Sequence, residues 1–287
     1  MGRFSHSTKI EQFILIAAII SIVTTLSIYI TNAPWAFVDW ENVFFPATEH
    51  LDQPYQIAGY VTPPWLLLFL APLSLFGENI SLAIWLTLSL LLSLWCLHQL
   101  TNDTLIIILC LLSPGFIRLV VHGQIDVLIL FGYVMLTTSN KLWLKSLGIL
   151  LMSIKPQVIG LSAIVYWLHA PRKEKPILLL PLITCILLSF FIYGLWPIKI
   201  VENMNRLPVA AFNFSPWPYG IGIGLFLIIY AIWKNNVVLG GLATFFLVPY
   251  FGSHSLFVYT CLLFTTIQRK WSILIFLLLW IITFYFS

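Results

Sequence analysis

The sequence predicts an all-α protein, a polytopic bundle of transmembrane helices. Sixty per cent of its 287 residues are hydrophobic and only 8% are charged, whereas a soluble globular chain is about 25% charged. So few charges cannot cover the surface of a water-soluble fold, and disorder needs low hydrophobicity. The mean hydropathy is +0.99, and apolar runs recur from Ile10 to Phe286. We therefore expect a single integral membrane domain over 1–287.

Twelve apolar runs are candidate membrane spans, because a spanning helix needs about 20 mostly apolar residues. The second run, 65–77, is too short for an untilted crossing, follows Pro63-Pro64 and contains Pro72, so we expect a re-entrant or interfacial helix there. The first run is longer than the apolar part of a signal peptide, and we expect a retained anchor. The runs are approximately 10–31, 65–77, 80–98, 104–121, 125–139, 142–154, 156–169, 176–196, 219–233, 236–251, 254–268 and 271–286.

The distribution of Lys and Arg predicts the topology, because cytoplasmic loops carry the excess of these residues. With the N-terminus inside and the second run not crossing, ten lie on the cytoplasmic side and four outside. If the second run crosses, six lie inside and eight outside. The first arrangement has the usual bias, so we expect about 11 crossings. It places the two longest loops, 32–64 and 197–218, on the non-cytoplasmic face, together with most of the carboxylates.

Several classes of function are excluded by what the sequence lacks. The net charge of +4 comes from basic residues spread over short loops, without a block that would bind nucleic acid. The four cysteines fall in apolar segments without metal-ligand spacing, so we interpret them as packing residues. Phosphate-binding and dinucleotide-binding glycine motifs are absent, as are the common hydrolase motifs.

Two charged residues are candidates for chemistry at the outer edge of the membrane. Asp39 stands about eight residues beyond the first apolar run, where a partly desolvated carboxylate could accept a proton from a hydroxyl. The alternative is a solvated loop acid or a helix cap. Lys155 lies between two short apolar runs, and a lysine within a membrane domain is a functional candidate whose natural partner there is a phosphate. The alternative is a lysine that snorkels to lipid head groups.

Other polar residues fall on the same predicted side. Arg118, His122, Gln124 and Asp126 surround Gly123, and such a group is not expected to face lipid. They either form part of a site or hydrogen-bond one another to close a tight turn. His254 opens an apolar run and is either a site residue or a packing residue. Asn205-Arg206 and the aromatic-proline run 212–219 could form a second wall of an outer cavity.

Several short motifs follow one another within residues 10–170. They are Asp39, Phe45-Pro46-Ala47, Pro54-Tyr55, Tyr60-Val61-Thr62-Pro63-Pro64-Trp65, Ala71-Pro72-Leu73, Gly123-Gln124-Ile125-Asp126 and Lys155-Pro156. Their order resembles the polyprenyl-phosphate-dependent glycosyltransferases of the GT-C fold, in particular glycosyltransferase family 87, the DUF2029 or alpha-mannosyltransferase group. The sequence departs from the family pattern in lacking a glycine before Pro54-Tyr55 and in having Asp126 where Asn is common. The chain is also shorter than usual for the family.

This resemblance implies a GT-C-like catalytic module over 10–170 followed by additional transmembrane helices over 171–287. It implies transfer of a sugar, commonly mannose, from a polyprenyl phosphate to a lipid or glycan acceptor, with inversion and with Asp39 as the general base. The residues that would bind the donor phosphate are Lys155, Arg118, Gln124 and His254. The residues that would contact substrate are Tyr55, His122, Asp126 and Arg206.

We expect no cofactor and no metal, because Lys and Arg can neutralise a lipid phosphate, although Glu49, His50 and Asp52 could form an oxygen-rich ion site. The expected partners are membrane lipids and the two substrates, with no nucleic acid. Short loops and the lack of an N-terminal targeting extension favour a prokaryotic plasma membrane, with the site on the outer face.

Two other functions fit the same residues. A transporter or flippase for a lipid-linked sugar would use the same cavity, but transporters place ionisable residues near the membrane midplane. A non-catalytic membrane subunit would keep the fold and would tolerate the loss of the Asp39 carboxylate.

Overall fold

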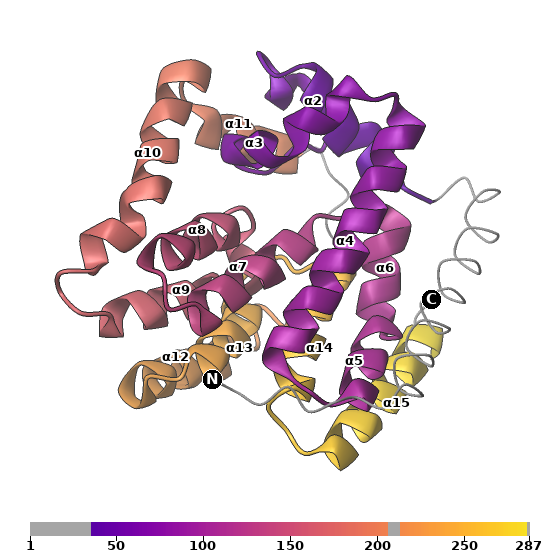
Figure 1. The fold of residues 1–287 in the computed structure, drawn as a ribbon, viewed down its shortest axis with the longest axis vertical. Coiled ribbons are helices and arrows are strands. Elements are labelled where there is room, and N and C mark those ends of the chain that lie inside the picture. Colours follow the sequence, from indigo (N-terminus) through magenta and orange to yellow (C-terminus); the bar gives the residue numbers. More distant parts are fainter. Residues whose placement is uncertain (1–35, 206–212, 286–287) are drawn as a thin grey trace.

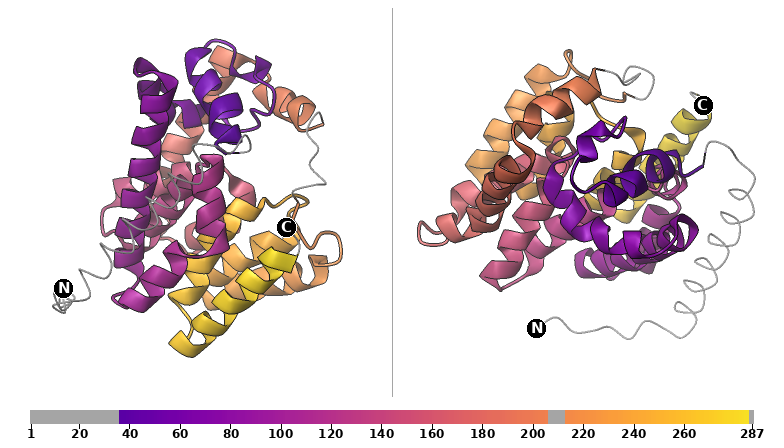
Figure 2. Two further views of the ribbon diagram at one scale, coloured as in Figure 1. Left: turned by 90° about the vertical axis from the view of Figure 1, so that its right-hand side faces the viewer. Right: turned by 90° about the horizontal axis from the view of Figure 1, so that it is seen from above.

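The computed structural model describes residues 36–205 and 213–285, and these residues form helices without a β-strand. The predicted all-α class is confirmed, while the predicted first span, 10–31, and Arg206 lie outside the described residues. Two long helices, α4 (Glu78–Leu100) and α10 (Lys175–Tyr193), flank a centre built from α7 (Asp126–Thr138), α8 (Leu142–Met152) and α9 (Pro156–His169) (Figure 1). The short helices before α4 lie together with α11 (Trp196–Met204) beside one end of α4 (Figure 2).

The segment before α4 is a series of short helical turns. Pro54, Pro64 and Pro72 each occupy the first or second position of a turn, where the missing N–H of proline leaves no hydrogen bond unmade. The run predicted as re-entrant or interfacial is a broken apolar helix from Pro64 to Leu75. The turns are η1 (Trp40–Phe44), α2 (Phe45–Glu49), η2 (Pro54–Gln56), η3 (Pro64–Leu66), α3 (Leu67–Leu70) and η4 (Ala71–Leu75).

Two described helices, α4 and α10, are long and apolar enough to cross a membrane. A third candidate is the pair α5 (Thr104–Leu111) and α6 (Pro114–His122), which is bent by 49° between the two helices. The other apolar helices are shorter; the 13 residues of α7, for example, extend only about 20 Å. The protein is therefore a helical membrane protein, but the predicted 11 crossings are not confirmed.

Helix α7 (Asp126–Thr138) is the centre of the core. It packs against α4, α8 (Leu142–Met152), α9 (Pro156–His169) and α14, and ten of its residues are buried. A Cβ atom added to Gly132 would lie 2.7 Å from the carbonyl oxygen of Gly148, and one added to Gly148 would lie 2.5 Å from that of Gly132. The two backbones therefore touch, and only glycine at both positions permits this approach.

The remaining helices cover the centre from the other side. Helix α13 packs against α9 and α12, and α14 packs against α5, α6 and α7. Their bounds are α11 (Trp196–Met204), α12 (Ile221–Lys234), α13 (Val237–Leu247), η6 (Ser253–Ser255), α14 (Leu256–Phe264) and α15 (Arg269–Tyr285).

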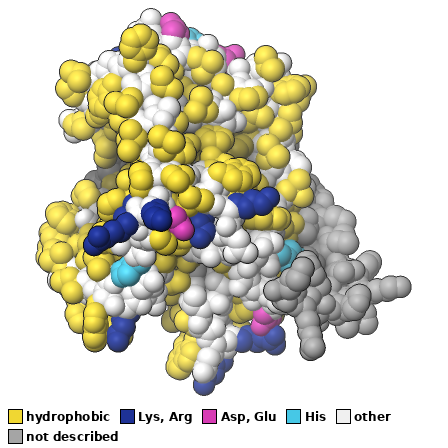
Figure 3. All heavy atoms as spheres, turned by 60° about the vertical axis from the view of Figure 1, so that its left-hand side comes forward, with side chains coloured by type: hydrophobic (Ala, Val, Ile, Leu, Met, Phe, Trp, Pro, Cys, Tyr) yellow, Lys and Arg dark blue, Asp and Glu magenta, His cyan; other side chains and the backbone are white. Residues whose placement is uncertain are grey.

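Helix α10 presents its side chains mostly outward. Only 11% of the most apolar 18-residue stretch of this helix is buried inside the protein. Its exposed side chains include Leu187, Phe191 and Ile192. Hydrophobic side chains dominate the molecular face seen in Figure 3, with Lys and Arg side chains gathered in its lower part. An apolar surface of this extent requires a non-aqueous environment, which is consistent with α10 facing lipid.

Candidate active site

Asp39 stands immediately before η1. Its backbone is already helical, and its carboxylate makes no capping hydrogen bond. The carboxylate is 35% exposed and lies 3.9 Å from Nδ1 of His122. Its Oδ2 atom accepts a hydrogen bond of 2.6 Å from Nε2 of Gln124. Asp39 is therefore neither a helix cap nor an isolated loop acid, which were the alternatives left open by the sequence.

The turn after α6 brings Gln124 to Asp39. Gly123 ends α6 in the left-handed conformation, with φ of +64°, and its N–H donates to the carbonyl of Val120. A Cβ atom on Gly123 would lie 2.6 Å from Cβ of Trp40. Trp40 in turn stacks on Trp85 of α4, with ring centroids 5.7 Å apart, and the Trp85 indole donates to the Gln124 carbonyl at 3.3 Å. Glycine is therefore required by both the backbone angle and the close approach.

Replacing Gly123 with Ala is expected to lower the midpoint of thermal unfolding. The left-handed backbone costs a residue with a Cβ about 1–2 kcal/mol, and the Trp40 contact adds a steric penalty. Gly77 is the control for replacing a glycine as such, because its φ is −60° and nothing lies within 4 Å of an added Cβ. Gly77→Ala should therefore cost less than Gly123→Ala. Equal losses would show that neither the left-handed backbone nor the approach to Trp40 matters.

Lys155 lies at the start of α9, where Pro156 occupies the first helical position. Its side chain is 9% exposed and reaches three groups on other segments. The ammonium Nζ donates to Oε1 of Gln124 at 2.6 Å and to Oδ2 of Asp126 at 2.8 Å, and it lies 3.4 Å from Nε2 of His254. The lysine is thus held by protein groups rather than extended toward a membrane surface.

Asp126 is fully buried at the start of α7, and both of its oxygens are engaged. Oδ2 accepts from Lys155, and Oδ1 accepts a 2.6 Å hydrogen bond from the hydroxyl of Ser255. The His254 Nε2 atom lies 3.7 Å from Oδ2. A buried carboxylate is tolerated when it is paired and hydrogen-bonded in this way.

These residues form one continuous polar network drawn from four parts of the chain. A single amide, that of Gln124, joins the carboxylate of Asp39 to the ammonium of Lys155. The inner members Gln124, Asp126 and Lys155 are buried. Asp39, His122 and His254 are 35%, 33% and 15% exposed, so they form the accessible side. Arg118 is half-buried on α6, and its guanidinium lies 5.6 Å from the centre of the Phe214 ring.

Other predicted site residues lie apart from this network. Tyr55 lines a different cavity, beside α11, and Arg206 lies outside the described residues. Among the described residues, no three His, Cys, Asp or Glu side chains form a group that could hold a metal ion. The suggested ion site at Glu49, His50 and Asp52 is therefore not formed; the ring of His50 contacts the carbonyl of Pro46 instead.

Sequence reasoning missed three residues of the site. Ser255 is a member of the network, and its only signal was that it follows His254 at the start of an apolar run. Trp40 and Trp85 form the wall that supports the Gln124 turn. Trp85 gave no signal, because an indole within an apolar helix is indistinguishable by sequence from an ordinary lipid-facing or core residue.

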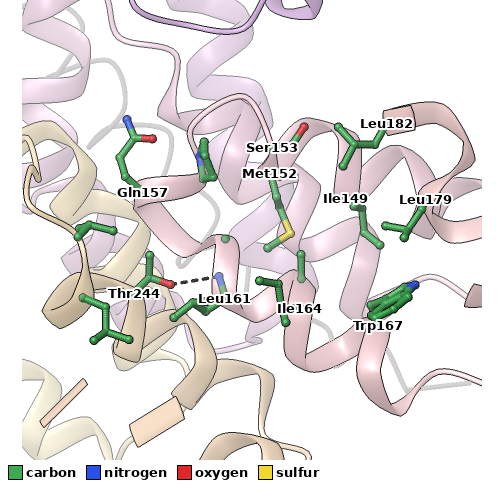
Figure 4. Close-up of a pocket in the computed structure, with 15 residues that line it drawn as sticks. Ile149, Met152, Ser153, Gln157, Leu161, Ile164, Trp167, Leu179, Leu182 and Thr244 are labelled. Atoms are coloured by element: carbon green, nitrogen blue, oxygen red, sulfur yellow. Dashed lines mark hydrogen bonds between the residues drawn. The ribbon is translucent and has the colours of Figure 1, made fainter. Parts of the chain in front are cut away.

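An apolar cavity of about 790 Å³ lies along α9 (Figure 4). Its first lining residue on this helix is Pro156, the residue after Lys155. Helices α8, α10 and α13 contribute the other walls, with Ile149, Leu182 and Leu247 among the lining residues. Thr244 on α13 accepts a hydrogen bond of 3.2 Å from the backbone N–H of Leu161 at this wall. The volume and the apolar lining of this cavity suit a hydrocarbon chain.

Comparison with known proteins gives one match. A protein-family model described as glycosyltransferase family 87 matches residues 60–191. The matched range contains Arg118, Gln124, Asp126 and Lys155, whereas Asp39 and His254 lie outside it. No curated protein and no solved structure matches the chain.

Proposed function

We propose that this protein is a glycosyltransferase, because residues 60–191 match glycosyltransferase family 87, the family that the sequence resembles. For this activity we propose a donor, an acceptor and a mechanism. The donor is a polyprenyl phosphate that carries a hexose, with mannose as the first candidate. The acceptor is a hydroxyl of a lipid or glycan. Transfer takes place at the non-cytoplasmic face of the membrane, with inversion at the anomeric carbon.

The observation that supports this proposal is the junction of Asp39 and Lys155 through Gln124. Glycosyl transfer from a lipid phosphate requires a base for the acceptor and positive charge for the leaving group. The network supplies a partly exposed carboxylate at one end and a buried ammonium at the other, separated by one amide. Two hydrogen bonds of 2.6 Å fix that amide. The positions of the base and the cation relative to each other are therefore fixed as well.

In the proposed reaction, Asp39 accepts the proton of the acceptor hydroxyl. The acceptor oxygen forms a bond to C1 of the sugar, while the bond between C1 and the phosphate oxygen breaks on the opposite face. The electron pair of that bond remains on the polyprenyl phosphate, whose negative charge increases. Oδ2 of Asp39 is occupied by Gln124, so we assign proton transfer to Oδ1.

The exposure of the network members refines the roles suggested by the sequence. We propose that Arg118, which is half-buried, and His254, whose side chain is 15% exposed, contact the donor phosphate. Lys155 is almost fully enclosed, so we propose that its charge stabilises the phosphate without direct contact, through Gln124 and His254. Direct contact would require the hydrogen bond between Lys155 and Gln124 to break first. Asp126 is fully buried with both oxygens occupied, and we assign it to positioning Lys155 rather than to contact with substrate. His122 is accessible beside Asp39 and stays a candidate for contact with the acceptor.

The apolar cavity along α9 supports a lipid-linked donor. Its first lining residue along α9 follows Lys155 directly, so a prenyl chain in this cavity would leave its phosphate near the polar network. The charge needed by that phosphate comes from side chains of this chain. We therefore propose that no metal ion is required.

The proposal is tested by incubating the purified protein, in liposomes, with polyprenyl-phosphate mannose and a candidate acceptor glycolipid. We expect mass spectrometry to detect a new glycoside and an equal amount of released polyprenyl phosphate, and we expect EDTA to leave the rate unchanged. Glucose- and galactose-bearing donors serve as the comparison for the sugar. A folded protein that consumes none of these donors would contradict the proposal and favour a non-catalytic subunit.

A further inference from the structure

A polar cavity of about 470 Å³ lies between the turns before α4 and the corner of α10 and α11. Its volume is in the range of small-molecule sites, roughly 300–1,000 Å³. It shares no lining residue with the network around Asp39 and Lys155. The lining residues are Asp52, Gln53, Pro54, Tyr55, Gln56, Tyr193, Lys199, Glu202 and Asn203.

Buried hydrogen bonds fix the wall of this cavity. Asn203 of α11 is 2% exposed, and its side-chain amide donates to the carbonyls of Tyr55 at 3.1 Å and Tyr60 at 3.2 Å. The Tyr55 hydroxyl donates to the carbonyl of Thr62 at 3.1 Å. Burial, with smaller effects of Tyr60 and Tyr193, raises the pKa of Tyr55, so the hydroxyl stays protonated for this bond. The wall is therefore formed before any ligand arrives.

The chemistry of the lining residues argues against three classes of ligand. The carboxylates of Asp52 and Glu202 outnumber the one ammonium, that of Lys199, so a phosphate or another anion would be repelled. A divalent cation is not favoured either, because the described residues contain no metal-binding group of three. A hydrocarbon chain would leave these charged groups without water or partners.

The remaining chemistry fits a neutral sugar. Carboxylates accept hydrogen bonds from neighbouring hydroxyls, and an ammonium or amide donates to them. The Tyr193 ring meets the Tyr55 ring edge to face, with centroids 6.4 Å apart and planes at 85°. An aromatic face is electron-rich and accepts the C–H edge of a pyranose ring. The exposed side-chain amide of Gln56 donates a hydrogen bond to Oε1 of Gln53.

We propose that this cavity binds a neutral pyranose unit and that, in the transferase reaction, this unit belongs to the glycan acceptor. The assignment to the acceptor rests on the proposed function, whereas the assignment to a sugar rests on the cavity alone. Glu202 and Lys199 are the hydrogen-bonding groups, and Tyr193 is the aromatic surface.

Saturation-transfer NMR tests the site on the full-length protein in detergent, with the methyl glycosides of mannose, glucose and galactose as probes. We expect at least one glycoside to bind, and Glu202→Gln to weaken its binding at least about tenfold, as expected for the loss of a charged hydrogen-bond acceptor. Tyr193→Leu should weaken binding, while Tyr193→Phe keeps the ring and the binding. Glu49→Gln is the matched control, because Glu49 is exposed on nearby α2 but does not line the cavity.

Absence of binding by all three glycosides would overturn the inference, and so would equal binding by the Glu202 and Tyr193 variants and the unmodified protein. Glu202 is exposed, so Glu202→Gln is expected to fold normally. A loss of binding in this variant can therefore be attributed to the cavity and not to unfolding. If the protein binds sugar with the expected pattern but transfers none, the proposed function fails and the sugar site stands. If it transfers sugar but these variants leave the KM for acceptor unchanged, the acceptor assignment fails alone.

Discussion

Replacing Asp39 with Asn is expected to lower the rate of glycoside formation by at least about a hundredfold, the lower range for loss of a general base. Asparagine has the same shape as aspartate, and its side-chain oxygen can still accept the hydrogen bond from Gln124. The variant should therefore keep the fold and the network while losing the group that accepts the proton. The measurement is the initial rate with saturating donor, together with the midpoint of thermal unfolding.

Glu41→Gln is the matched control for this variant. Glu41 lies two residues further along the chain, is exposed, and is not among the hydrogen-bond partners of the Gln124 and Lys155 side chains. Partial burial, and then the neighbouring Glu78 carboxylate, raise the pKa of the Glu41 carboxyl. Its replacement should leave turnover within about twofold, because no proton transfer is assigned to it. Near-normal turnover in Asp39→Asn would remove Asp39 from the mechanism.

Replacing Lys155 with Met is expected to lower both stability and activity. Methionine fills the space of the lysine stem but leaves the Asp126 carboxylate in the protein interior without its cation. Breaking a buried ion pair by removing one partner costs about 3–5 kcal/mol. The cost is measured as the change in the free energy of unfolding from reversible denaturation with SDS. Activity should fall as well, because the charge next to the leaving phosphate is lost.

The double variant Lys155→Met with Asp126→Asn separates these two effects. It removes both charges, so it should be more stable than Lys155→Met alone, yet it should be no more active. Lys141→Met is the control for loss of an exposed lysine, since Lys141 precedes α8 on the surface. The free energy of unfolding lost by the double variant is compared with the sum of the losses in Lys155→Met and Asp126→Asn. If the two were equal, the pair would not be coupled and Asp126 would not position Lys155.

Hydropathy located most helices but not their lengths or their path. The run 176–196 corresponds to the single helix α10, and the run 156–169 has the bounds of α9. By contrast, the run 104–121 is two helices, because Pro114 begins a new helix with Ser113 as its cap. Ser113 accepts a hydrogen bond from the backbone N–H of Phe116, which ends the continuity of the span. An apolar run shows that a segment avoids water, but it does not show whether the segment crosses the membrane or packs within the protein.

The sequence by itself determined the helical membrane class, the resemblance to glycosyltransferase family 87 and the two charged residues at the ends of the network. Composition fixes the class because it sets which surroundings the chain can tolerate, and the short motifs carry the resemblance because their order is specific. Only the tertiary structure decided that Gln124 joins Asp39 to Lys155, that Asp126 is enclosed with Ser255, and that Tyr55 belongs to another cavity. Those facts depend on contacts between segments as many as 129 residues apart, and such contacts follow from packing in three dimensions, to which the spacing of residues along one chain gives no direct access.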